Sequence, residues 1–214
     1  MAKLIKRGAE ADIWLGRWLH LPAIFKVRTP RPYMHERLDE RTRKHRTYHE
    51  AQFVAESKKL GVPTPLVYHV NVGSFTIVMQ YLPGPRLKEL LACPTPRLYL
   101  CRSMGAHLAT LHSHGVVHGD PTTSNFIFSD GKLAVIDFGL SYRTTLLEDI
   151  AVDLHLVKEV FSSAHADLSK DAMDEFKLGY ATVAGLPKTE RLWERARDIE
   201  RRGRYARSEW GATS

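Results

Sequence analysis

Two short motifs contain the residues whose types and spacing could carry chemistry. Asp120 ends the motif His-Gly-Asp, and Asn125 follows it five positions later. Asp137 begins the motif Asp-Phe-Gly, directly after the apolar run 133–136. Carboxylate and amide oxygens can hold the metal ions that neutralise a triphosphate. Phosphoryl transfer needs such oxygens, so these three residues are candidates for that reaction. Each motif alone is a weak signal, and the alternative is a chance coincidence of a buried His, a turn Asp and a capping Asn.

The two motifs together resemble the catalytic and metal-binding loops of the protein-kinase-like superfamily. The resemblance implies that Asp120 accepts or orients the proton of the substrate hydroxyl, and that Asn125 and Asp137 bind magnesium. It therefore implies ATP and Mg²⁺ as cofactors. It also implies a strand lysine that contacts the phosphates and pairs with a glutamate on the following helix. Lys26 is the candidate catalytic lysine, and Glu50 is its predicted partner, with Glu56 as an alternative.

The remaining ATP contacts follow from the same resemblance. Met79 falls at the gatekeeper position, and the backbone of Gln80 and Leu82 is expected to face adenine. Ile136, just before the metal-binding aspartate, is also assigned to the ATP site. Plain strand and turn residues are the alternative reading of the segment 78–84.

The turn over the phosphates departs from the family pattern, because no GxGxxG sequence is present. One glycine and two alanines can still form a tight turn, although the backbone approaches phosphates less freely than a glycine-rich one. A carboxylate in this turn is unusual, because it would repel phosphate unless it is paired or displaced. The turn residues assigned to ATP binding are Gly8, Ala9, Glu10 and Ala11.

The hydrophobic pattern predicts the elements that position the residues of the first half. Short strands are expected within 3–28, a loop at 29–35 where two prolines occur, and a helix over 36–60 that ends at Gly61. A β-hairpin is predicted at 66–72 and 74–80, with Gly73 at the turn. The breaker-rich segment 81–85 is the best candidate for a boundary between lobes.

The second half reads as mostly helical. A short helix is expected at 86–92, and a longer one from Thr95 as N-cap and Pro96 as first residue to about 114. Strands at 126–128 and 132–136 flank an Asp-Gly pair that is typical of a type I′ turn. Helices with a break near 185–187 follow from about 147. This order predicts an α+β fold. We expect a single minimal kinase domain over 1–214, with a β-rich N-lobe at 1–82 and a reduced helical C-lobe at 83–214.

Composition and charge narrow the class of protein. The chain has 214 residues, 43% hydrophobic and 26% charged, which is ordinary for a globular domain. The net charge is +7, and arginines cluster at 26–46 and near the C-terminus. A basic C-terminal tail suggests tRNA or partner contact, although a solvated basic surface is the alternative. The tail arginines assigned to such contact are Arg201, Arg202, Arg204 and Arg207.

Targeting signals and cysteine chemistry are not apparent. No apolar run approaches the length of a membrane span, and the N-terminus lacks the apolar core of a secretory signal. Cys93 and Cys101 are read as reduced structural thiols. We therefore expect a cytoplasmic protein without membrane contact, with the nucleus also possible for a eukaryotic source.

Four segments together resemble a particular branch of the superfamily, the PRPK family of small atypical kinase/ATPase subunits of the KEOPS (EKC) complex. They are Gly8–Ala11, Lys26–Arg28, His118–Asp120 and Glu148–Leu154, and the C-terminal Arg-Gly-Arg adds to the match. The resemblance implies a Mg-dependent ATPase and non-specific Ser/Thr protein kinase. It also implies that the complex makes threonylcarbamoyladenosine at position 37 of tRNA. The implied partners are the threonylcarbamoyl transferase, other KEOPS subunits and tRNA.

Two other function classes remain open on the sequence. Aminoglycoside and choline kinases share His-Gly-Asp with Asn at +5, so a small-molecule phosphotransferase is the first alternative. A catalytically silent RNA-binding or scaffold subunit is the second. Only about 75 residues follow Asp-Phe-Gly, and no Ala-Pro-Glu motif occurs among them, so most of a peptide-docking platform is missing. Pro121 replaces the Leu usual in the family, which predicts a stiffer catalytic loop.

Overall fold

The computed structural model describes residues 2–211, with side chains as far as residue 202. The chain packs as two compact units. The first contains the residues up to Gly84 together with Ser129–Gly139, and the second contains Pro85–Phe128 and the residues from Leu140 onward. The short segment with Asp137 therefore packs with the N-terminal unit. The predicted single domain with lobes at 1–82 and 83–214 stays a prediction.

The first unit is built on a five-stranded antiparallel sheet in the order β1-β2-β3-β5-β4. Lys26 lies in the central strand of this sheet, opposite Ile13 on one side and Ile77 on the other. The central position gives its backbone two hydrogen-bonded neighbours and fixes where its side chain leaves the sheet. The strands are β1 (Lys3–Lys6), β2 (Ala11–Trp18), β3 (Leu21–Arg28), β4 (Val67–Asn71) and β5 (Thr76–Gln80).

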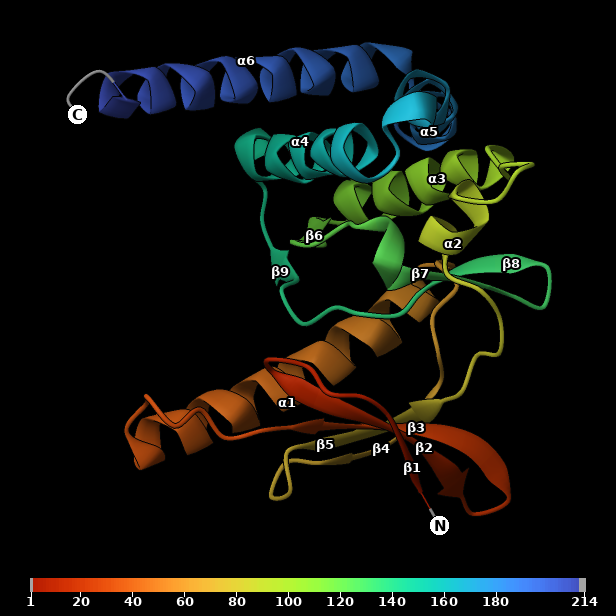
Figure 1. The fold of residues 1–214 in the computed structure, drawn as a ribbon, viewed down its shortest axis with the longest axis vertical. Coiled ribbons are helices and arrows are strands. Elements are labelled where there is room, and N and C mark those ends of the chain that lie inside the picture. Colours follow the sequence, from red (N-terminus) through yellow and green to blue (C-terminus); the bar gives the residue numbers. More distant parts are fainter. Residues whose placement is uncertain (1, 212–214) are drawn as a thin grey trace. The chain divides into compact units, whose positions relative to one another are not determined.

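Helix α1 (Glu36–Lys59) lies across one face of this sheet (Figure 1). Its first turn is acidic and its last turn is basic, which favours both ends of the helix dipole. Gly61 follows in the left-handed region with φ of 86°, as the predicted helix end requires. Ala51 of the helix packs against Ile77 and Met79 of the sheet, so the apolar face of α1 covers the core of this unit.

The second unit is a helical bundle in which α3 packs closely on α5 and α4 packs on α6. Two glycines allow the close approach of the first pair. A Cβ at Gly105 would lie 2.0 Å from the backbone oxygen of Phe176, and one at Gly179 would lie 1.8 Å from that of Arg102. The helices are α2 (Leu87–Leu91), α3 (Tyr99–Ser113), α4 (Leu147–Ala164), α5 (Ser169–Ala184) and α6 (Leu186–Gly211).

The start of helix α3 differs from the prediction, because Thr95 is not its N-cap and Pro96 is not its first residue. The helix begins at Tyr99, with Leu98 as N-cap. The backbone N–H of Arg97 donates to the carbonyl of Leu90 at 3.4 Å, which ties this segment back to α2. The chain can therefore turn into a helix only after this contact.

Short strands and turns complete the fold. β6 (Val116–Val117) pairs with β9 (Tyr142–Arg143), and β7 (Phe126–Ser129) pairs with β8 (Lys132–Val135). Asp130 and Gly131 have φ of 49° and 75°, so the predicted type I′ turn between β7 and β8 is confirmed. Two 3₁₀ turns, η1 (Thr123–Asn125) and η2 (Ala166–Leu168), follow the His-Gly-Asp motif and α4. None of the helices within residues 2–211 is both long and apolar enough to cross a membrane.

Candidate functional site

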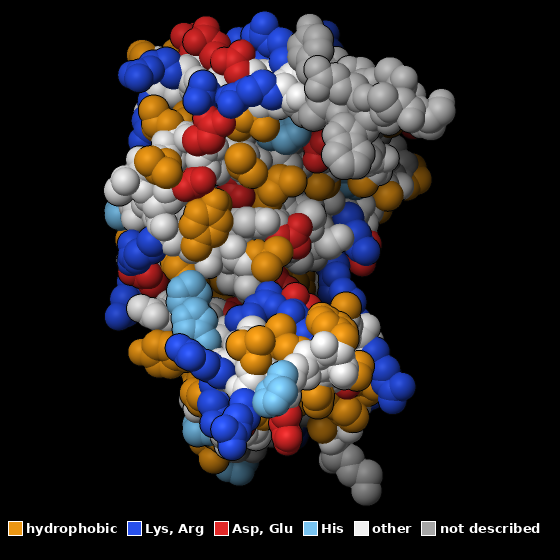
Figure 2. Space-filling view, turned by 90° about the vertical axis from the view of Figure 1, so that its left-hand side faces the viewer, with side chains coloured by type: hydrophobic (Ala, Val, Ile, Leu, Met, Phe, Trp, Pro, Cys, Tyr) orange, Lys and Arg blue, Asp and Glu red, His pale blue; other side chains and the backbone are white. Residues whose placement is uncertain are grey.

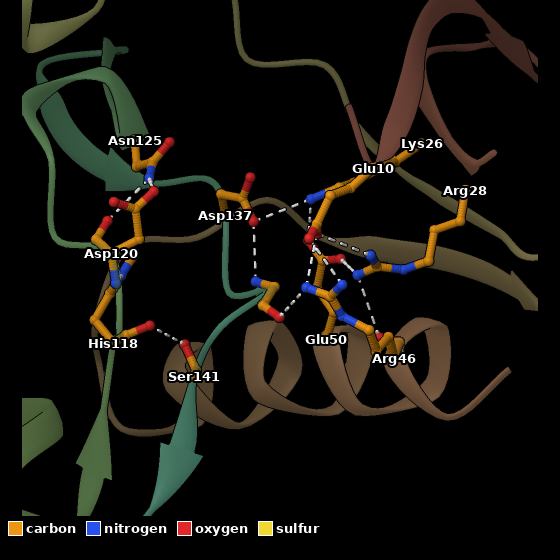
Figure 3. A network of polar contacts seen from close by, with 11 residues as sticks. Glu10, Lys26, Arg28, Arg46, Glu50, His118, Asp120, Asn125, Asp137 and Ser141 are labelled. Carbon is orange, nitrogen blue, oxygen red and sulfur yellow. Dashed lines mark hydrogen bonds and ion pairs between the residues drawn. The ribbon is translucent and has the colours of Figure 1, made fainter. Parts of the chain in front are cut away.

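The lysine of the central strand holds two carboxylates of the first unit. Lys26 Nζ lies 2.5 Å from Glu50 Oε1 and 3.0 Å from Asp137 Oδ1 (Figure 3). Glu50 comes from α1, and Asp137 follows strand β8. The predicted partner of Lys26 is thus Glu50, and the alternative Glu56 does not take this position. Three residues far apart in sequence meet within one compact unit.

Lys26 and Glu50 are both buried, so the pKa of each group depends strongly on the charges around it. Burial of the Lys26 ammonium would lower its pKa, but the charges of Glu50 and Asp137 and hydrogen bonds to both outweigh that effect and raise the pKa. Complete burial raises the pKa of the Glu50 carboxyl, while the nearby charges of Lys26 and Arg28 act in the opposite direction. The net direction for Glu50 is a raised pKa, so its two cationic neighbours oppose the effect of burial without reversing it. Lys26 therefore stays charged at neutral pH.

Arg28 is the second cation at Glu50, and the sequence reasoning gave it no role. Its Nη2 lies 2.5 Å from Glu50 Oε2, and its side chain is 3% exposed. The strand sequence indicates that Arg28 lies beside Lys26, because the two residues are two positions apart and therefore point to the same face. The helix carried a similar signal, since Arg46 precedes Glu50 by one turn on the same face.

The turn between β1 and β2 is tight, as predicted. The N–H of Gly8 donates to the carbonyl of Ala11 at 3.1 Å, and a Cβ at Gly8 would lie 2.7 Å from that oxygen. Ala9 is exposed within the turn, and Ala11 is buried at the start of β2. Glu10 does not stand alone in this turn, because its carboxylate pairs with Arg28, Arg31 and Arg46. Its charge is therefore compensated inside the protein. The assignment of these four turn residues to ATP binding stays a prediction.

The predicted adenine-facing residues follow one another at the end of the sheet. Met79 is 4% exposed and packs in the core of the first unit. The side-chain oxygen of Gln80 accepts a hydrogen bond from the N–H of Leu66 at 3.2 Å, so the side chain of Gln80 ties the end of β5 to the start of β4. Leu82 and Ile136 are half-buried. The assignment of these four residues to the ATP site stays a prediction.

Asp137 is held in place by the backbone of its own motif. The N–H of Gly139 donates to Asp137 Oδ1 at 2.9 Å, and the Asp137 side chain is 43% exposed. Arg46 Nη2 of α1 donates to the carbonyl of Gly139 at 3.4 Å. The Asp-Phe-Gly segment is thus fixed on both sides, and its carboxylate still reaches solvent.

The second unit carries the His-Gly-Asp motif and its asparagine. The side-chain nitrogen of Asn125 donates to both the carbonyl and Oδ2 of Asp120, at 2.9 and 2.8 Å. Its amide oxygen lies on the side away from Asp120 (Figure 3). The N–H of Thr122 donates to the Asp120 carbonyl at 2.8 Å, across Pro121. Proline suits the centre of such a three-residue turn because its φ is fixed near the required value, which accounts for Pro121 in this loop.

Asp153 anchors this motif from α4. Its Oδ2 accepts the N–H of His118 at 2.7 Å, and its Oδ1 accepts the N–H of Gly119 at 2.9 Å. His112 Nε2 lies 3.1 Å from Oδ2. Burial would raise the pKa of Asp153, but the hydrogen bond and charge of His112, the charge of His118 and the backbone N–H of His118 lower it. The sequence indicates Asp153 only as part of a family motif, because sequence spacing does not show which backbone groups it contacts.

The glycine of His-Gly-Asp has a steric reason. Gly119 has φ of 79°, and a Cβ there would lie 2.3 Å from the carbonyl oxygen of Leu140. The residue after Leu140 also holds the loop, since the hydroxyl of Ser141 donates to the carbonyl of His118 at 2.9 Å. The His-Gly-Asp loop is therefore fixed by close backbone packing as well as by Asp153.

The tail arginines with described side chains are paired within the chain. Arg201 contacts Asp198, and Arg202 contacts Glu148, at 2.9 and 3.1 Å. On the face shown in Figure 2, Lys and Arg side chains lie in separate groups, with Asp and Glu beside several of them. The side chains of Arg204 and Arg207 lie outside the described residues. Contact of the tail with tRNA or a partner stays a prediction.

The comparisons with known proteins find relatives at different levels of similarity. Residues 113–199 match the phosphotransferase enzyme family. The chain is also 40% identical to the KEOPS complex subunit Bud32 of Pyrococcus abyssi over 216 residues, which cover 97% of this chain and 98% of that protein. The chain belongs to the Bud32 family. This confirms the family predicted from the sequence.

Some relatives are longer proteins that contain a segment similar to this chain. The match to a probable bifunctional tRNA threonylcarbamoyladenosine biosynthesis protein of Methanocaldococcus jannaschii has 39% identity over 202 residues. It covers 94% of this chain but 37% of that protein. The chain thus spans just over a third of the bifunctional relative.

Solved structures confirm the kinase-like α+β fold of this Bud32 family member. The Rio2 kinase in its ADP/Mg²⁺-phosphoaspartate complex from Chaetomium thermophilum has a TM-score of 0.62 and 16% identity, and the match covers 95% of this chain and 72% of that one. WaaP in complex with acyl carrier protein has a TM-score of 0.64 and 18% identity, over 97% and 88%. At these identities the likeness concerns the fold.

Asp137 in the first unit and Asn125 in the second each have an oxygen that suits magnesium. Among the residues that the structure describes, no group of three or more His, Cys, Asp or Glu side chains could hold a metal ion unaided. Asp137 offers an exposed carboxylate. The amide nitrogen of Asn125 donates to Asp120, so its amide oxygen is the atom that remains for a metal. Magnesium in such sites takes one or two protein oxygens and completes its shell with phosphates and water.

Proposed function

We propose that this chain is the ATP-hydrolysing, atypical Ser/Thr protein kinase subunit of a KEOPS complex, in support of threonylcarbamoyladenosine modification of tRNA. The observation that carries the proposal is the contact of Lys26 with both Glu50 and Asp137, in a chain that matches Bud32 over nearly its whole length. An intact charged set of this kind is hard to explain in a silent scaffold, because apolar residues of similar volume often stabilise a fold as well as a buried ion pair does.

Each side chain has a definite task in this proposal. Asp137 and Asn125 would each offer an oxygen to Mg²⁺, which would neutralise the charge of the ATP phosphates. Lys26 would offer its ammonium to the phosphates. Asp120 takes the proton of the attacking hydroxyl or orients it. Glu50 keeps Lys26 charged and aligned.

The proposed partners are the threonylcarbamoyl transferase, the other KEOPS subunits and tRNA. The names of the relatives support them, since Bud32 of Pyrococcus abyssi is a KEOPS complex subunit. A cytoplasmic location is proposed on the same basis, with the nucleus possible for a eukaryotic source.

ATP turnover tests this function directly. We would measure Mg²⁺-dependent ATP hydrolysis by the chain alone, with the threonylcarbamoyl transferase, and with the transferase and tRNA. Stimulation by both partners is the result that the proposal predicts. Turnover that is unchanged by either partner would contradict the KEOPS assignment.

A small-molecule phosphotransferase is the second candidate, because residues 113–199 match the phosphotransferase enzyme family. The same assay distinguishes it. Stimulation by a small alcohol such as choline or an aminoglycoside, with no response to the transferase, would favour this candidate over the first.

A further inference from the structure

Glu10 is the one carboxylate in the turn expected to cover the phosphates, and the proposed chemistry gives it no task. It lies between β1 and β2, and its side chain is 44% exposed. A free carboxylate there would oppose the binding of a triphosphate. Its actual contacts suggest a different role.

Two arginines hold the carboxylate of Glu10 at hydrogen-bond distance. Arg46 Nη1 lies 2.9 Å from Oε1, and Arg46 Nη2 lies 2.7 Å from Oε2, which is the fork geometry of a bidentate pair. Arg31 Nη2 lies 2.8 Å from Oε1, and Arg28 Nη1 lies 3.7 Å from Oε2. The backbone carbonyl of Glu10 also accepts the N–H of Thr29 at 3.2 Å. The turn is thus fastened by its side chain and its backbone.

The bidentate partner lies on the helix that carries Glu50. Arg46 precedes Glu50 by one turn on the same face of α1. The sheet and the turn before β2 therefore contact this helix at two places. The first contact is Glu10 with Arg46, and the second is Lys26 with Glu50. Arg46 also donates to the carbonyl of Gly139 at 3.4 Å. A shift of α1 would therefore disturb both the helix glutamate and the Asp-Phe-Gly segment.

The ionised form of Glu10 is favoured. Partial burial would raise its pKa, but the hydrogen bond and charge of Arg46 and the charges of Arg31 and Arg28 lower it. The contact with Arg46 is consequently present throughout the neutral range.

We propose that Glu10 is a positioning residue that holds helix α1 through Arg46, so that Glu50 meets Lys26 and the Asp-Phe-Gly segment stays in place. In this role, Glu10 fixes the turn through contacts inside the protein, whereas a glycine-rich loop acts by contacting the phosphates directly. This role rests on the proposed ATP chemistry for its kinetic consequence, but not for its structural one. The competing idea is that Glu10 only repels phosphate and so weakens ATP binding.

The variant Glu10→Gln separates these ideas, with Glu40→Gln as the matched control. Glu40 is an exposed residue of α1 that pairs with Lys44. Hydrogen exchange in the free chain needs no ATP turnover, so it tests positioning even if the proposed function is wrong. We expect the amides of residues 44–52 to exchange roughly tenfold faster in Glu10→Gln than in the control. Equal exchange in the two variants would overturn the proposal.

Kinetics give the second arm. Positioning predicts that Glu10→Gln lowers kcat roughly tenfold and leaves the KM for ATP unchanged or higher. Simple repulsion predicts a lower KM with unchanged kcat, and that result would overturn the proposal. Arg46→Gln and the double variant complete a cycle. We expect the double variant to be no slower than Arg46→Gln alone, whereas additive losses would show that Glu10 does not act through Arg46.

Discussion

The two units of this chain hold their functional residues in different ways. In the first unit, Lys26, Arg28, Glu50 and Asp137 are held by contacts between charged side chains. In the second, Asp153 grips the backbone of the catalytic loop through the N–H groups of His118 and Gly119. Side-chain ion pairs can exchange partners, for example a carboxylate for a phosphate, without unfolding the chain. A backbone anchor cannot be released without losing the loop.

This contrast predicts which substitutions affect activity and which affect folding. In the first unit Glu50 has two cationic partners, so losing one should leave a folded protein. In the second unit, each oxygen of Asp153 accepts a different backbone N–H. A change at Asp153 should therefore leave at least one of these N–H groups without its acceptor. The following predictions test the contrast, from the largest expected effect to the smallest.

Asp120→Asn should give the largest effect on activity. The asparagine oxygen can still accept the hydrogen bond from Asn125, so the loop keeps its shape while the proton acceptor is lost. We expect ATP-dependent phosphoryl transfer to fall about 1000-fold with an unchanged melting temperature. Asp130→Asn, in the turn between β7 and β8, is the control. Equal activity of the two variants would remove Asp120 from the chemistry.

Asp153→Asn should give the largest effect on stability. An amide presents one acceptor and one donor, so one of the two backbone N–H groups would face another N–H. We expect a loss of about 3 kcal/mol in the free energy of unfolding, measured by urea denaturation at neutral pH. A loss below about 0.5 kcal/mol, the level of an ordinary surface change, would refute the anchor.

Lys26→Met should separate function from folding in the first unit. Glu50 keeps Arg28 at 2.5 Å, so we expect a stability loss of only about 1 kcal/mol. Phosphoryl transfer should still fall roughly 100-fold, because the phosphates lose their positioned cation. Denaturation and turnover of one preparation provide both values. A stability loss as large as that of Asp153→Asn would mean that the two units do not differ in this way.

The acid stability of the loop follows from the lowered pKa of Asp153. A carboxylate with a lowered pKa contributes stability above its ordinary pKa of 3.8, and this contribution disappears as the pH falls through the folded-state value. The stability gap between the wild type and Asp153→Asn should therefore be constant near neutral pH and narrow below pH 3.8. Urea titrations across this range measure it, and a gap that widens in acid would have the wrong sign.

The smallest effect concerns the tail. Arg201 and Arg202 already have acidic neighbours, so their proposed contacts with tRNA replace weak exposed ion pairs. Replacing both with alanine should weaken tRNA binding and reduce the log–log salt slope by up to about 0.9 per lost phosphate contact on a duplex. An unchanged slope would leave the tail as a solvated surface.

The sequence predicted those features that depend on local pattern. The bounds of α1, the turn at Asp130 and the Lys26–Glu50 pair follow from periodicity, turn chemistry and a family motif. The predicted start of α3 was wrong, because a backbone hydrogen bond from Arg97 to Leu90 outweighs the capping signal at Thr95. The roles of Arg28, Arg46 and Asp153 were missed, since their partners are far away in the chain and spacing does not show such contacts.

ATP hydrolysis by Asp137→Asn tests the central claim most directly. The asparagine oxygen can still accept the N–H of Gly139, so the segment should stay folded, while the metal loses a charged ligand and Lys26 loses a partner. Wild type and variant would be assayed with Mg²⁺, the threonylcarbamoyl transferase and tRNA. The account predicts a fall of at least about 100-fold with an unchanged melting temperature. Turnover equal to that of the wild type would contradict it.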